Sequence, residues 1–288
     1  EPHDVTSLAA ASGCVVSIMR GTFYQNEIGA ALYHNKETYC RVCGYRCLLF
    51  NRSYMARSNR SSPAWERIPA LQDALQDPTC SFAMWVDADA LFYGPFALPT
   101  IKTPIAFARD VGGLNAGVMY FAHSGVSDSL LQLAWAQDQF ATIIRGAEQT
   151  AFRTVLRANP QLLGHVTIFD NLVRYPYYFR PWQVRKNRSL MKNLKLWPPL
   201  FHAAGCIASR PHAVCHRWLV ENLRIAKQRF AQRSNCTVQA LDEVVFARSA
   251  TRADTHLSDF DLGLPIAQHH YNRAKRARAH VGRAPMKA

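Results

Sequence analysis

Two aspartates, Asp87 and Asp89, stand one residue apart directly after an apolar run, residues 81–86. The run has the length and composition of a strand buried on both faces of a parallel sheet. Ligands bind outside the carboxyl ends of such strands, so both carboxylates are expected at a site. They suit a hard divalent cation, Mn²⁺ or Mg²⁺, that keeps positions for water and substrate phosphate. The same spacing also occurs in solvated turns, which is our interpretation of Asp259 and Asp261, since no apolar run precedes them.

The elements that must position these aspartates alternate between strands and helices, which predicts an α/β fold with a parallel sheet. A glycine near the start of the fifth strand, Gly117, permits close approach by a ligand or another backbone. Residues 197–206 form a short apolar segment that carries a histidine, and residues 174–182 receive no assignment. We expect strands over residues 14–21, 45–50, 81–86, 105–110 and 114–122, and helices over residues 26–43, 63–77, 127–140, 146–157 and 211–233.

Length and charge limit the class of protein. The 288 residues suffice for one large α/β domain, expected over residues 1–270, followed by a basic, disordered tail over residues 271–288. The formal charge of +14 favours a polyanionic partner, a membrane surface or a phosphorylated substrate. No apolar run of 18 or more residues remains to span a bilayer, so we expect membrane attachment only through an anchor trimmed from this chain.

The cysteines and glycosylation sequons favour an oxidising compartment. Eight cysteines are usual for a chain folded in the secretory pathway, and acceptor tripeptides begin at Asn51, Asn59, Asn187 and Asn235. We therefore expect disulfides. Their connectivity stays open, although Cys206 and Cys215 are close enough in sequence to pair. A zinc site made by Cys40, Cys43, Cys47 and Cys80 is the less favoured alternative, because the spacing matches no common zinc pattern.

Seven short motifs follow one another along the chain: NEIG (26–29), NKETYC (35–40), AWERIPAL (64–71), MWVDADALF (84–92), GLNAGV (113–118), EQTA (148–151) and FHAAGC (201–206). Their order resembles that of glycosyltransferase family 34, which includes plant xyloglucan xylosyltransferases and fungal Golgi galactosyl- and mannosyltransferases. The resemblance covers roughly residues 14–215. The glycogenin-like family 8 has a similar motif order but lacks the Tyr-Cys pattern before the second strand.

This resemblance implies a GT-A fold, a Rossmann-like and mostly parallel sheet flanked by helices, in an enzyme that transfers a sugar from a UDP-sugar with retention of configuration. The expected sugar is galactose or xylose, and the expected acceptor is a glycan or glycoprotein. The expected cofactor is Mn²⁺, with Mg²⁺ as a possible substitute. The expected location is the Golgi lumen. It also implies that Asp87, Asp89 and His202 are the metal ligands, with Gly205 completing the histidine motif. Without the motif, a histidine in an apolar segment is more often a buried core residue.

The resemblance assigns further residues to the donor. Arg67 replaces a lysine that reaches the phosphates, Asn115 and Gly117 match the Asn-x-Gly element, and Gln149 matches a glutamine near the donor sugar. Glu148 replaces an aspartate and is the nearest candidate nucleophile, although we favour positioning by Gln149 over covalent catalysis. Read as residues alone, Arg67, Glu148 and Gln149 would be solvated helix positions, and Asn115 a turn former.

One departure leaves a second class of function open. Ile207 stands where the family often has a lysine that contacts the diphosphate, so Arg210 or His212 would have to substitute. The alternative is a catalytically inactive GT-A fold, or a basic module that binds a polyanionic polysaccharide. Nucleic acid is disfavoured, because no nucleic-acid recognition motif is present. The sequence decides neither the acceptor nor the oligomeric state.

Overall fold

The computed structural model describes residues 12–19, 27–54, 60–97, 101–110, 113–143, 146–169, 173–174, 200–203, 212–233 and 236. Within them the chain forms a six-stranded sheet in the order β2-β1-β3-β6-β5-β7. Its strands are β1 (Ser12–Ile18), β2 (Arg46–Phe50), β3 (Cys80–Val86), β5 (Ile105–Asp110), β6 (Gly113–Ala122) and β7 (Val166–Phe169). The predicted α/β class and the mostly parallel sheet are confirmed.

The strand that leads into the two aspartates, β3, differs from the prediction in the direction of one neighbouring strand. β3 runs parallel to β1 on one side but antiparallel to β6 on the other. β6 is also antiparallel to β5, from which only two residues separate it. So short a connection forces a hairpin, because parallel neighbours need a crossover of a dozen or more residues. β6 therefore enters the sheet reversed, and β3 is not inside a wholly parallel sheet.

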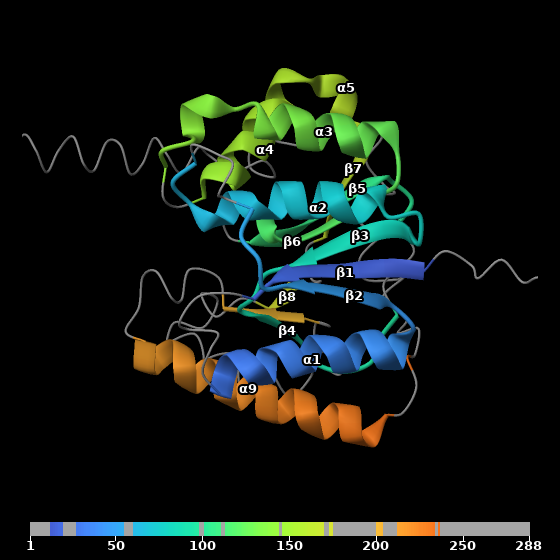
Figure 1. Cartoon of the computed structure of the whole chain (residues 1–288), viewed down its shortest axis with the longest axis vertical. Coiled ribbons are helices and arrows are strands. Elements are labelled where there is room, and N and C mark those ends of the chain that lie inside the picture. The colour runs from blue at the N-terminus through green and yellow to red at the C-terminus, as the bar shows by residue number, and fades with distance from the viewer. Residues whose placement is uncertain are drawn as a thin grey trace, which may run out of the picture.

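Helices cover both faces of the sheet (Figure 1). One face carries η3 (Pro63–Glu66), α2 (Arg67–Gln76), α3 (Gly125–Trp135), η4 (Asp138–Phe140), α4 (Ala147–Ala158) and α5 (Pro160–Leu163), and the other carries α1 (Glu27–Cys43) and α9 (His212–Gln232). The helix predicted over residues 127–140 was wrong in its extent. It ends at Trp135, and Gln137 leaves the helical region with φ −81° and ψ 68°. Arg60, held between the Trp65 and Trp135 rings, donates to the Trp135 carbonyl at this end.

A second, three-stranded sheet lies between the large sheet and the α1–α9 layer (Figure 1). Its order is β4-β9-β8, with β4 (Ala90–Phe92), β9 (Leu200–His202) and β8 (Val173–Arg174). β9 comes from the apolar segment 197–206, and β8 includes Arg174, the first residue of the stretch left without assignment. Because β4 follows the aspartates at once, this small sheet decides which distant residues reach them.

Three disulfides tie the first strands and helix together. Cys14–Cys80 joins β1 to β3, Cys40–Cys47 joins α1 to β2, and Cys43–Cys236 joins α1 to a residue after α9. The predicted disulfides are confirmed, and every cysteine of the zinc alternative is used in one, so that alternative was wrong. The side chains of Cys206 and Cys215, as well as Asp259, Asp261 and residues 271–288, lie outside the described part of the chain. Among the described helices, none combines the length and apolarity needed to cross a bilayer.

Candidate functional site

The two aspartates and one distant histidine converge at the carboxyl end of β3. Asp87 and Asp89 occupy the turn between β3 and β4, and β4 pairs with β9 so that Ala90 lies opposite His202. His202 Nε2 lies 3.2 Å from Asp87 Oδ2 and 3.3 Å from Asp89 Oδ1. Ligand atoms of the three residues all lie within 4.8 Å of one another. Two carboxylate oxygens and one imidazole nitrogen form a donor set that fits Mn²⁺.

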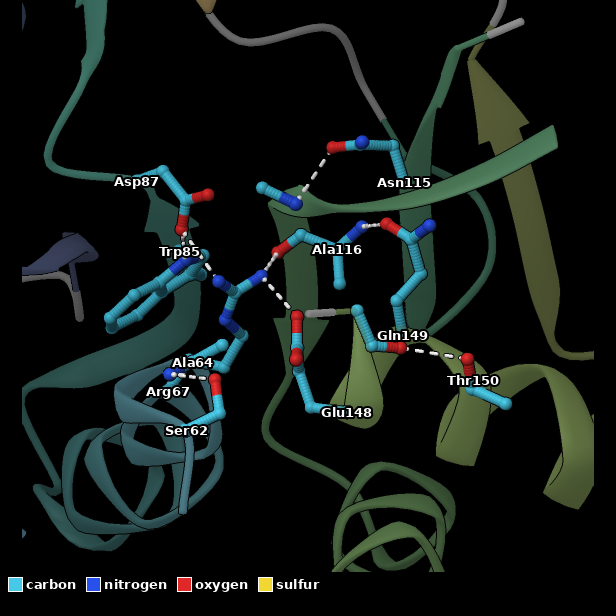
Figure 2. Close-up of polar contacts among 12 residues, drawn as sticks. Ser62, Ala64, Arg67, Trp85, Asp87, Asn115, Ala116, Glu148, Gln149 and Thr150 are labelled. Carbon is cyan, nitrogen blue, oxygen red and sulfur yellow. Dashed lines mark hydrogen bonds and ion pairs between the residues drawn. The ribbon is translucent and has the colours of Figure 1, made fainter. Parts of the chain in front are cut away.

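Asp87 uses its two oxygens differently (Figure 2). Oδ1 accepts a hydrogen bond from Trp85 Nε1 at 2.6 Å and lies 3.2 Å from Arg67 Nη2, whereas Oδ2 faces His202. Burial raises the pKa of the Asp87 carboxyl, but the charges of Arg67 and His202 outweigh burial and hold the pKa below its usual range. Asp87 is therefore ionised at neutral pH, with one oxygen anchored to protein and the other directed to the cluster.

The His202 ring lies directly against Gly117 of β6. A Cβ atom at position 117 would stand 1.9 Å from His202 Cε1 and 2.6 Å from Nδ1. The close approach that the glycine permits is thus made by the candidate metal ligand itself. Burial lowers the pKa of His202, but the Asp89 and Asp87 carboxylates outweigh it and raise the pKa to about 9. A proton therefore occupies this imidazole at neutral pH when no cation competes with it.

Arg67 is the centre of a buried ionic bridge, not the solvated helix residue of the alternative interpretation. Its guanidinium donates from Nη1 to the Ala116 carbonyl at 2.6 Å, and the same nitrogen lies 3.1 Å from Glu148 Oε1. Nη2 lies within ion-pair distance of Asp87, so one side chain connects the candidate metal ligands to α4 (Figure 2). The planar fork suits this double contact better than an ammonium would. Its contact with donor phosphates stays a prediction.

Glu148 and Gln149 lie in the first turn of α4, which Gly146 starts with a φ of 63°. Both side chains are buried, so the interpretation as a solvated face was wrong. Glu148 Oε1 pairs with Arg67, while Oε2 is buried without a hydrogen-bond partner among the described residues. Gln149 Oε1 accepts from the Ala116 N–H at 3.0 Å, which leaves its Nε2 end as the donor.

Asn115 is held by its own strand and by the end of β5. Its Oδ1 accepts from the Gly117 N–H at 2.8 Å, and its Nδ2 donates to Asp110 Oδ2 at 2.8 Å. The side chain is therefore fixed beside the residue that supports His202. Gly205 and Ile207 lie outside the described residues, so the structure does not place them.

Three residues without a predicted role complete the site: Lys36, Trp85 and Arg153. Trp85 holds Asp87, and Arg153 donates to the Leu114 carbonyl beside Asn115. Lys36 donates to main-chain carbonyls of the aspartate turn. Burial lowers the pKa of Lys36 to about 7, against the opposing effect of the Asp89 and Asp87 charges. Lys36 and Trp85 had a sequence signal, since they stand in the NKETYC and MWVDADALF motifs, whereas Arg153 lies outside every motif.

Comparison with known proteins matches this chain to glycosyltransferases. Residues 15–97 match the model of the galactosyl transferase GMA12/MNN10 family. An alpha-1,2-galactosyltransferase of Schizosaccharomyces pombe is 22% identical over 201 residues, which are 53% of this chain and 53% of the relative. A probable glycosyltransferase 6 of Oryza sativa subsp. japonica is 33% identical over 117 residues, 36% of this chain and 23% of the relative. The chain thus spans about half of the first relative and about a quarter of the second.

A solved structure supports the fold. A glycosyltransferase involved in the glycosylation of the major capsid of PBCV-1 superposes with a TM-score of 0.52 at 14% identity, over 73% of this chain and 99% of the other. At this identity the likeness establishes the fold alone, which is GT-A as predicted. The family match and the curated relatives confirm the predicted relationship. Over residues 15–97 the chain therefore matches the galactosyl transferase GMA12/MNN10 family, which is the resemblance to glycosyltransferase family 34 that its motifs predicted.

Proposed function

We propose that this chain is a metal-dependent glycosyltransferase that moves a sugar from a UDP-sugar to a glycan or glycoprotein, with retention of configuration. The observation that carries the proposal is the convergence of Asp87, Asp89 and His202 at the carboxyl end of β3 in a GT-A fold. We propose Mn²⁺ as the cation, because a mixed oxygen and nitrogen donor set suits it better than Mg²⁺. When bound, the cation supplies positive charge that stabilises the diphosphate leaving group.

The protein's own residues divide the remaining work. Arg67 is fixed by three contacts at the junction of the metal cluster and α4, where its charge is preorganised near the departing diphosphate. Glu148 shares its Oε1 with that guanidinium, which weakens it as a nucleophile, so we propose that it holds Arg67 and does not attack the sugar. Gln149 positions the donor sugar through its Nε2 end. The acceptor hydroxyl would then attack from the face that UDP leaves.

We also propose which sugar the enzyme transfers and in which compartment it works. Galactose is the first candidate, because the fungal relative is a galactosyltransferase, and xylose is the second. We propose that the chain works in the Golgi lumen, since three disulfides fit an oxidising compartment. The sequon asparagine Asn51 is exposed, which fits glycan attachment there.

The test is release of UDP from a panel of UDP-sugars by the purified chain, with Mn²⁺ and with chelator. We expect Mn²⁺-dependent release from one donor and its loss in Asp89→Asn, because that change removes a charged ligand. Asp128→Asn, the same change in the first turn of α3, is the matched control and should keep the activity. If no donor is hydrolysed and UDP with Mn²⁺ fails to raise the melting temperature, the chain does not bind a donor and the proposal is wrong.

A further inference from the structure

Lys36 lies fully buried beneath the turn that carries the two aspartates. It belongs to α1, and its Nζ donates to the carbonyls of Ala88 at 3.1 Å and Ala90 at 2.6 Å. Burying an ammonium group costs free energy unless hydrogen bonds replace its water. A leucine or methionine would fill the same space without that cost. The two carbonyl contacts are therefore the property that requires a lysine here.

The two carbonyls flank Asp89 on both sides. The carbonyl of Asp89 itself accepts from the Ala203 N–H at 3.2 Å, next to His202. Three consecutive carbonyls of the turn are thus held, two by Lys36 and one by the segment that presents the histidine. These contacts restrict the main chain of Asp89, from which its carboxylate reaches to within 3.3 Å of His202 Nε2.

The preceding residue, Asn35, makes a parallel but separate attachment. Its Nδ2 donates to the Phe92 carbonyl at 2.9 Å, and its Oδ1 accepts from the Phe92 N–H at 2.8 Å. Asn35 therefore fixes the far end of β4, two residues beyond the part that Lys36 holds. Consecutive side chains of α1 thus bind the same short strand, but only one of them contacts the main chain next to a candidate metal ligand.

We propose that Lys36 is a positioning residue for the metal centre, holding the main chain on either side of Asp89 so that its carboxylate meets the cation. The inference rests on the proposed metal site, and it deepens it by assigning the residue behind the ligand. Positioning and plain electrostatics predict opposite results here. A positive charge near the site repels a cation, so if charge were its only effect, removing Lys36 would tighten metal binding. If Lys36 positions Asp89, its removal weakens metal binding.

The experiment measures Mn²⁺ binding to the purified chain without nucleotide, from the loss of the free Mn²⁺ signal in electron paramagnetic resonance. Lys36→Met keeps the aliphatic stem and removes the donors. We expect its Mn²⁺ dissociation constant to rise about tenfold, the lower end of the usual range for residues behind metal ligands. Asn35→Ala is the control. It removes two buried hydrogen bonds from the same helix and strand, and should lower the melting temperature while leaving the dissociation constant within about twofold.

Several results would overturn the inference. Unchanged or tighter Mn²⁺ binding by Lys36→Met excludes positioning, and equal losses in Lys36→Met and Asn35→Ala show a general effect of loosening β4. If Lys36→Met does not fold, Lys36→Gln decides: its nitrogen is one atom nearer the helix and reaches one carbonyl at most. We expect Lys36→Gln to raise the Mn²⁺ dissociation constant about threefold. An unchanged dissociation constant would contradict the inference. Absence of Mn²⁺ binding by the wild-type chain would instead refute the metal site itself.

Discussion

Replacing Gly117 with alanine should displace the His202 ring. The added Cβ would stand 1.9 Å from His202 Cε1, and carbon atoms in contact need about 3.5 Å, so the ring has to move by about 1.6 Å. Metal–ligand distances tolerate only about 0.2 Å. The φ angle of Gly117 is not positive, so alanine adds no backbone strain. The effect falls chiefly on the histidine, because the nearest contact of the added Cβ outside the ring, Asn115 Oδ1 at 2.9 Å, is much less severe. We expect the Mn²⁺ dissociation constant to rise at least about tenfold and UDP release to fall about a hundredfold.

The assay combines Mn²⁺ titration with UDP release, and a glycine elsewhere provides the control. Gly164 has a φ of −63° and no atom within 4 Å of an added Cβ, so Gly164→Ala should leave both measurements unchanged. The Gly117→Ala change should also cost little in a His202→Ala background, where no ring remains to be displaced. The steric argument is refuted if Gly117→Ala binds Mn²⁺ as the wild-type chain does. It is also refuted if the losses of Mn²⁺ affinity in Gly117→Ala and His202→Ala add fully in the double variant.

Three further changes follow from the same contacts. Arg67→Met leaves two carboxylates buried without their shared partner, and urea unfolding should show a loss of about 3–5 kcal/mol, smaller for Arg67→Lys. Removing the bridge between Cys43 and Cys236, which are 193 residues apart, should lower the unfolding free energy by about 2–5 kcal/mol, measured as a lower melting temperature. Because the pKa of His202 is raised to about 9 without metal, raising the pH removes the competing proton: Mn²⁺ affinity should increase from pH 7 upward by up to about tenfold per unit, then level off near pH 9. A flat profile would mean that the imidazole does not bind the metal.

Most of the large sheet could be predicted because its strands are short apolar runs between recognisable stops. The direction of β6 was the exception. The strands predicted over residues 105–110 and 114–122 are only three residues apart, and so short a connection already requires an antiparallel neighbour. The end of α3 was unpredictable for a different reason. Arg60, 75 residues earlier in the chain, donates to the Trp135 carbonyl at this end, and no local sequence pattern indicates such a contact.

Site residues could be predicted where the residue type and the local sequence indicate the role. They could not be predicted where the role depends on contacts with distant parts of the chain. Asp87 and Asp89 stand out because two acids end an apolar run. His202 is 112 positions after Ala90, and only the pairing of β4 with β9 brings the two together. Lys36 is a basic residue in the middle of a helix, which normally indicates solvent exposure. Its burial depends on the position of the small sheet, which the periodicity of apolar residues in the helix does not indicate.

The family match covers one part of the proposed site and not the other. The matched segment, residues 15–97, contains both candidate metal carboxylates, the lysine behind them and the arginine that pairs with Asp87. Gln149, the residue proposed to position the donor sugar, lies beyond it. The match therefore supports metal and diphosphate binding more strongly than it supports any one sugar. A galactosyl relative of 22% identity is a weak guide to the donor, which is why the UDP-sugar panel has to include xylose and glucose beside galactose.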